Sequence, residues 1–124
     1  MGKYQNDLML DAALNYIKTN ADGGSMVVLA SSATLYAHVT ASALASATTA
    51  SGDWTVGDGD TSGRKVTYVG ASGVTVATTG TANHLALTDG SGTLYYVTTV
   101  TSQALTATNT LTIPTFDIEI SDAT

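Results

Sequence analysis

Oxygen-bearing side chains recur at every second position in Asp58-x-Asp60-x-Ser62-Gly63, which matches the first six positions of a calcium-binding loop. In such a loop the alternate side chains meet one cation, and the sixth position is a glycine that permits a sharp turn. A complete loop needs a bidentate Glu at its twelfth position, where this chain has Val69, although Asp53 could add a ligand. A polar turn between two strands explains the pattern more simply, so we predict no metal site.

His38 and His84 are the two candidates for a general base, and neither lies at a recognisable metal-ligand spacing. The G-x-S-x-G elbow that exposes a serine nucleophile is absent from the sequence. With no cysteine, the chain has no disulfide, thiolate metal site or cysteine nucleophile. The chain has a single Glu and a single Trp, which argues against a cleft that cleaves sugars with paired carboxylates. We therefore expect no catalytic residue and no cofactor, and predict that the protein is not an enzyme.

The charge content argues against nucleic acid as a partner, and the length of the apolar runs argues against a membrane. Four basic residues face ten acidic ones, for a net charge of −6, and Arg64-Lys65 is the only adjacent basic pair. Binding to nucleic-acid phosphates needs clustered Lys and Arg, so we expect no nucleic-acid partner. The longest apolar run, Met26 to Ala30, is far below the ~20 residues that cross a membrane. Polar residues interrupt the N-terminal segment where a secretory signal would be apolar, which predicts synthesis and use in a cytoplasm, or release from it by cell lysis.

A chain of 124 residues is predicted to form a single domain, residues 1–124, because it can bury a core without disulfides. Residues 1–6 show no periodicity and are predicted to form a flexible N-terminal arm. Residues 7–19 are predicted to be a helix, because Asn6 can cap it and the charges at its two ends oppose the helix dipole. Its apolar residues cover a wide arc. The helix is therefore either buried deep against the body or presents one flank to a subunit partner.

Residues 26–120 are predicted to form the β body. Between Gly63 and Val100, apolar and polar residues alternate over short runs that end at turn residues, such as the turns at Gly70–Gly73 and Asp89–Gly92. Similar runs occur at Met26–Ala30, Trp54–Val56, Leu105–Ala107, Leu111–Ile113 and Phe116–Ile120. About eight short antiparallel strands with one N-terminal α-helix predict a mainly β protein with a β-sandwich or jelly-roll-like body, or a small β-barrel.

Three further features add to this prediction. Residues 34–44 fit both a short helix and a strand, and residues 46–53 are predicted to be a loop. Tyr95-Tyr96 should place one ring on each face of the same strand. Threonine is the most used residue, and a surface rich in Thr, Ser and Gly loses little rotamer entropy when a partner covers it. That composition suits a protein that packs against copies of itself or against a lattice.

Three segments resemble small structural head proteins of tailed bacteriophages: NDLMLDAALNYI (6–17), WTVGDGDTSGRKV (54–66) and TGTANHLALTD (79–89). The similarity continues to Ile120 and so extends over nearly the whole chain. It concerns a pattern of segments and includes no catalytic motif. Within this group the chain resembles a capsid decoration, or cement, protein.

The resemblance implies a structural virion protein that binds the outer surface of the assembled head and stabilises the capsid lattice against internal DNA pressure. It implies the major capsid protein as partner, a homo-oligomer (dimer or trimer), and a location on the capsid exterior. From the arm alone we predict Lys3, Tyr4 and Gln5 as capsid contacts. The alternative function is a phage tail, connector or fibre-type β module that binds a partner protein or a host glycan.

Overall fold

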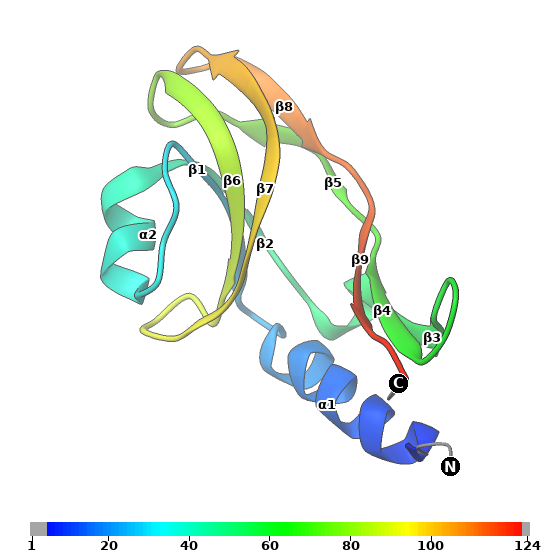
Figure 1. Ribbon diagram of the computed structural model, residues 1–124. Coiled ribbons are helices and arrows are strands. Elements are labelled where there is room, and N and C mark those ends of the chain that lie inside the picture. Colours follow the sequence, from blue (N-terminus) through cyan, green and yellow to red (C-terminus); the bar gives the residue numbers. More distant parts are fainter. Residues whose placement is uncertain (1–4, 123–124) are drawn as a thin grey trace.

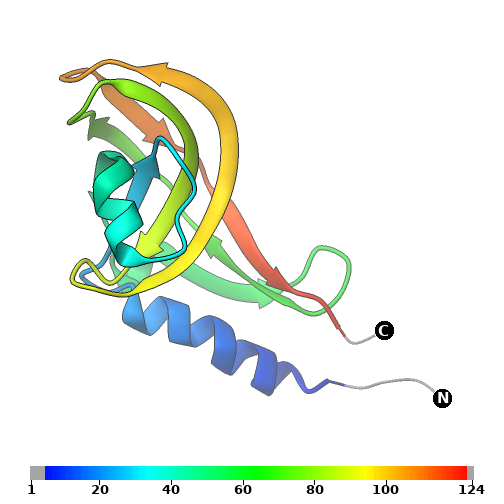
Figure 2. The ribbon, with the colours of Figure 1, turned by 60° about the vertical axis from the view of Figure 1, so that its left-hand side comes forward.

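The computed structural model describes residues 5–122 of the chain. It confirms a mainly β protein with an N-terminal helix, and it contains nine strands in this range where about eight were expected. The described strands form a curved, sandwich-like body that does not close into a barrel, and helix α1 lies along one end of this body (Figures 1 and 2).

Helix α1 (Asp7–Asn20) confirms the helix predicted over residues 7–19. It begins where predicted, because the Asn6 side-chain oxygen accepts a hydrogen bond from the Leu8 N–H at 2.8 Å and so satisfies one free donor of the first turn. Asp7 lies in the first turn and Lys18 in the last, where each charge opposes the helix dipole.

The larger sheet has four antiparallel strands in the order β2-β1-β6-β7. These strands are β1 (Ser25–Leu29), β2 (Ala43–Thr48), β6 (Gly80–Thr88) and β7 (Leu94–Leu105). The apolar run predicted at Met26–Ala30 is the central strand β1, which is buried on both faces. Strand β7 is an edge strand that pairs with β6 alone among the described residues.

Two smaller antiparallel sheets complete the body, one in the order β3-β4-β9 and the other the pair β5-β8. Their strands are β3 (Trp54–Asp58), β4 (Arg64–Tyr68), β9 (Phe116–Ile120), β5 (Ala71–Thr75) and β8 (Thr110–Ile113). A single bridge between Ala45 and Val76 connects β2 to the chain just after β5. Pro114 lies between β8 and β9, at a strand end as a residue without an N–H requires.

The main core lies between the sheets and includes a cluster of four aromatic rings. Trp54 and Tyr68 are each 1% exposed, and their ring centroids lie 4.9 Å apart. Phe116 contacts both of these rings, and Tyr96 of β7 stacks on Phe116. The cluster therefore joins the β3-β4-β9 sheet to the edge strand of the larger sheet.

Helix α2 (Tyr36–Ser42) covers the other face of the larger sheet (Figure 1). Val39 of this helix belongs to a second apolar cluster with Val27, Leu29 and Ala86. Residues 34–44, which the sequence left undecided, therefore contain both a helix and the start of a strand. The loop predicted over residues 46–53 is wrong, because β2 continues to Thr48 and a 3₁₀ turn (η1, Ser51–Asp53) follows.

Two other predictions are corrected by the strand pairing. The separate strand predicted at Leu105–Ala107 is wrong, because Leu105 is the last residue of the 12-residue strand β7. The turn predicted at Gly70–Gly73 is also wrong, because β4 and β5 continue in one direction and pair with different partners. Gly70 provides the bend between them with φ of +88°, and a Cβ there would lie 2.6 Å from the Ile113 carbonyl oxygen.

Candidate functional site

The exposed face of α1 carries three of the large apolar side chains that the body leaves uncovered. Leu8 is 77% exposed, Met9 57% and Tyr16 59%. Leu8 and Tyr16 are eight residues apart and lie on one side of the helix, with exposed Ala12 between them. Together with exposed Ala13 these residues form what we call the helix stripe. The helix is therefore not buried deep against the body, which was one of the two predicted arrangements.

The opposite side of α1 holds the helix to the body. Leu10 and Leu14 are 4% and 1% exposed, and Ile17 packs against the main core. Arg64 of β4 adds a polar anchor, since its Nε lies 2.7 Å from Asp11 Oδ1 and its Nη1 pairs with Asp58. The helix stripe is thus presented to solvent by a helix that is fixed on its inner side.

An aromatic contact links the stripe to the edge strand β7. The Tyr16 ring meets the Tyr95 ring edge-on, with centroids 6.1 Å apart. Tyr96 points to the other face and stacks on Phe116, which confirms that the two adjacent tyrosines use opposite faces of their strand. Loss of hydration is the main cause that raises the pKa of the Tyr95 hydroxyl. Tyr16 therefore has a preferred orientation, although most of its surface is exposed.

Asp58 and Asp60, the candidate calcium ligands, each pair with a basic side chain. Asp58 pairs with Arg64, and Asp60 Oδ1 lies 2.6 Å from Lys65 Nζ. The hydrogen bond that Lys65 donates to Asp60 is the main cause that raises the pKa of the Lys65 ammonium. Ser62 accepts a hydrogen bond from the Asp122 N–H. This geometry is the polar turn that we preferred, with the carboxylates held by neighbouring cations.

Asp53, the proposed additional ligand, accepts a hydrogen bond from the Ala50 N–H at 2.9 Å instead. Within residues 5–122, no group of three or more His, Asp or Glu side chains is placed to hold a metal ion. The two histidines have neutral neighbours: His84 Nδ1 lies 2.6 Å from Asn83 Oδ1, and His38 Nδ1 lies 3.3 Å from Thr34 Oγ1. These contacts fit structural roles on β6 and α2.

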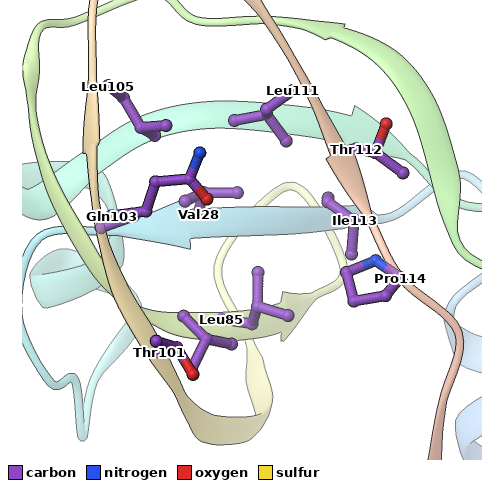
Figure 3. A pocket seen from close by; sticks show the side chains of 11 residues that line it. Val28, Leu85, Thr101, Gln103, Leu105, Leu111, Thr112, Ile113 and Pro114 are labelled. Atoms are coloured by element: carbon purple, nitrogen blue, oxygen red, sulfur yellow. The ribbon is translucent and has the colours of Figure 1, made fainter.

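A groove of about 250 Å³ lies between β7 and β8. Figure 3 shows Val28 and Leu85 on its floor, with Leu105, Leu111 and Ile113 at its sides. Thr101, Gln103 and Thr112 are its polar lining residues, and no charged residue lines it. The groove is a second candidate binding surface, and its chemistry suits an uncharged, largely aliphatic ligand. We call it the seam groove.

Of the three capsid contacts predicted in the N-terminal arm, the structure describes Gln5 alone. Lys3 and Tyr4 lie outside the described residues. Gln5 is described and is partly buried, and its side-chain oxygen is buried without a hydrogen-bond partner among residues 5–122. The role of these three residues in binding stays a prediction.

The charged residues are distributed unevenly, a signal that the sequence contains and that our sequence analysis missed. No Asp, Glu, Lys or Arg occurs in residues 23–52, 66–88 or 90–116. These runs supply α2 and the whole of β1, β2, β5, β6, β7 and β8. The charges are concentrated on α1, the β3–β4 hairpin and β9, which lie toward the same end of the body (Figure 1).

Among the helices of the described part, none is long and apolar enough to cross a membrane. No family model, curated protein or solved structure matches this chain.

Proposed function

We propose that this chain is a structural virion protein that binds the outer surface of an assembled phage head and stabilises the capsid lattice against internal DNA pressure. The observation that supports protein binding most directly is the helix stripe. An exposed, contiguous apolar surface on a folded domain is typical of a protein–protein interface. The segments similar to phage head proteins support the choice of the head as partner. The proposed partner is the major capsid protein, and the proposed state on the lattice is a homo-oligomer.

The side chains on the surface of the body are of types that a partner can cover at a low cost in free energy. Most of the strands carry Thr, Ser and Ala and no charged side chain. Covering such a surface removes few ions from water, and it immobilises short side chains that lose little conformational entropy. A partner can therefore cover a large area of this protein without having to supply matching charges.

Stabilisation of a head by such a protein follows from mass action. A protein that binds the assembled lattice, and not the free capsid subunits, shifts the assembly equilibrium toward the intact shell. Each contact can be weak, because many copies bind to one shell. The protein needs no catalytic group for this function, only a stable body and an adhesive surface.

The test measures binding of the purified chain to emptied, expanded heads of the phage that encodes it. We expect saturable binding by co-sedimentation and a higher melting temperature of the heads. Tyr16→Ser should weaken binding about tenfold or more, because it removes an exposed aromatic ring from the stripe. Leu35→Ser is the matched control, since Leu35 is also 59% exposed and lies outside α1. It should bind as the unmodified chain does.

Failure of the unmodified protein to bind heads, or to raise their melting temperature, would contradict the proposal. Copy number per virion then distinguishes the alternative, because a decoration protein is present in hundreds of copies and a connector in a handful. Binding to host glycans by the isolated chain would favour the fibre-type module instead.

A further inference from the structure

The strands of the body form an open arc whose two ends are β7 and β8. The arc runs β7-β6-β1-β2, continues through the Ala45–Val76 bridge, and ends with β5-β8. Strands β7 and β8 follow each other in sequence, yet within residues 5–122 β7 pairs only with β6 and β8 only with β5. Each strand therefore has one unpaired edge, and the seam groove lies between these edges (Figure 3).

The edge of β7 is interrupted near the groove. The β6–β7 register passes from Ala82–Gln103 to His84–Thr99, so four steps along β7 accompany two steps along β6. Bulges of this kind are a device by which proteins prevent unwanted pairing at an edge strand. The bulge contains Val100 and Thr101, both of which line the groove.

The edge of β8 has no bulge on its own side, and only its short length of 4 residues and Pro114 after its last residue limit pairing there. Three steps along β5, from Ala71 to Val74, accompany two steps along β8, from Ile113 to Leu111, so the irregularity of that pair lies on β5. No charged residue occurs from position 90 to 116, although edge strands are commonly protected by charges. The unpaired N–H and C=O groups of Thr110–Ile113 therefore remain available to another strand.

We propose that the seam groove is a docking site for one extended, uncharged segment of a partner protein, which pairs with the free edge of β8. The segment places alternate aliphatic side chains over Leu85 and Leu111. An extended main chain can pair with the backbone groups of an unpaired strand edge along the whole strand. The groove volume of about 250 Å³ is below the range of about 300–1,000 Å³ typical of pockets that enclose small molecules.

The lining specifies the charge of the segment. Every residue around the groove is neutral, so an ionised side chain placed there would lose its hydration without gaining a partner. Val28 and Leu85 on the floor favour Val, Ile or Leu in the docked segment. The occupant is therefore neutral and has aliphatic residues at alternate positions, which is the period of an extended strand.

Gln103 supplies the polar group that recognises the main chain of the segment. Gln103 is exposed, lines the groove, and extends its amide over it (Figure 3). A glutamine amide offers two donors and an acceptor, which match the C=O and N–H of a passing backbone. This inference concerns a surface separate from the helix stripe and holds whichever protein supplies the segment.

The experiment titrates the full chain, labelled with ¹⁵N, with the peptide acetyl-TVTITVT-amide and follows its NMR spectrum. We expect shifts of the Thr110–Ile113 amide signals and of the Gln103 side-chain amide, together with slower hydrogen exchange along β8. Two control peptides replace the central Ile by Lys or by Pro. The Lys peptide should bind at least tenfold more weakly because of its charge, and the Pro peptide because it lacks an N–H.

Two variants test the groove itself. Gln103→Glu should weaken binding of acetyl-TVTITVT-amide about tenfold, which corresponds to one hydrogen bond exchanged for an unpaired charge. Ser102→Glu is the matched control, because Ser102 is an exposed neighbour that does not line the groove. It should leave the affinity unchanged. Since both positions are exposed, circular dichroism should show that both variants fold.

Three results would overturn the proposal. The first is no shift at β8 up to several millimolar peptide, or shifts confined to α1. The second is equal weakening by Gln103→Glu and Ser102→Glu. The third is a concentration-dependent dimer of the unliganded chain whose interface maps to β8, which would show that a second copy fills the groove. Head binding that persists in Gln103→Glu would leave the proposed function intact while the peptide titration decides the groove.

Discussion

Replacement of Leu14 by Ala tests which side of α1 holds the helix to the body. Leu14 is 1% exposed and belongs to the main core, whereas Leu8 on the helix stripe is 77% exposed. Alanine does not disturb the helix, because it has the highest helix propensity. Any large loss of stability must therefore come from lost packing and from the cavity that the smaller side chain leaves.

The expected magnitudes differ strongly between the two positions. Leu14→Ala should lower the free energy of unfolding by about 3 kcal/mol, the lower part of the range for buried leucines, because a helix at one end of the body can relax toward the cavity. Leu8→Ala should change it by less than about 0.5 kcal/mol, since most of that side chain is already in water. For a chain of this size, 3 kcal/mol corresponds to a fall in melting temperature of about 10 °C.

Urea unfolding monitored by Trp54 fluorescence measures both variants. Trp54 is the only tryptophan and is 1% exposed, so its emission reports loss of the core. At a slope of roughly 2 kcal/mol per molar urea, the Leu14→Ala midpoint should fall by about 1.5 M. Equal losses for Leu8→Ala and Leu14→Ala would refute the orientation of the helix, and with it the helix stripe as a free surface.

Two further predictions concern the packing around Trp54 and the loss of stability at low pH. The Trp54 indole N–H is buried without a partner in the described part of the chain, so Trp54→Phe should cost less than about 1.5 kcal/mol and Trp54→Ala more than about 3 kcal/mol. Both variants lack the tryptophan, so their urea unfolding is followed by circular dichroism. Equal costs would show that the N–H has a structural partner, such as a water molecule. Backbone N–H donors, first that of Thr93, lower the pKa of Asp89, and the Thr67 hydroxyl is the main cause that lowers the pKa of Asp117. Because both carboxyl groups have a higher pKa in the unfolded chain than in the folded one, the unfolded chain takes up protons at a higher pH. The melting temperature should therefore fall as the pH drops below about 4, and Asp89→Asn should flatten that dependence.

The elements that the sequence predicted correctly are those whose position depends on a few neighbouring residues. Helix α1 has its cap at Asn6 and its charges at the favourable ends, so its position follows from a few neighbouring residues. The period-two runs of β4 and β9 alternate apolar and polar side chains because the apolar face of each packs against the main core. This pattern also needs no knowledge of distant residues.

The elements that the sequence predicted poorly depend on contacts between distant segments. Residues 46–48 form a strand because Ala47 pairs with Met26 of β1, which no local pattern of Ala, Ser and Thr reveals. Strand β7 stays continuous through Thr101–Ala104 because β6 pairs with both of its halves around the bulge. Tertiary pairing overrides weak local preference in both cases.

The two candidate surfaces differed in how far the sequence could reveal them. The wide apolar arc of residues 7–19 predicted either burial or a partner, and the structure was needed only to show which side chains stay exposed. The seam groove could not be predicted in this way, because it exists only where β7 and β8 fail to pair although they are neighbours in sequence. A missing pair of strands leaves no local pattern in the residues that line the gap.

The charge-free runs supply the seam groove but not the helix stripe, because α1 carries Asp7, Asp11 and Lys18. A chain with ten acidic and four basic residues repels other acidic surfaces unless its charges are kept away from the contact. Here the strongest local charges are paired within the β3–β4 hairpin and with α1, as in the contacts of Arg64 and Lys65. The seam groove lies among strands that have no charge at all. A neutral segment docked in the seam groove would therefore meet no charged side chain of the residues that line it.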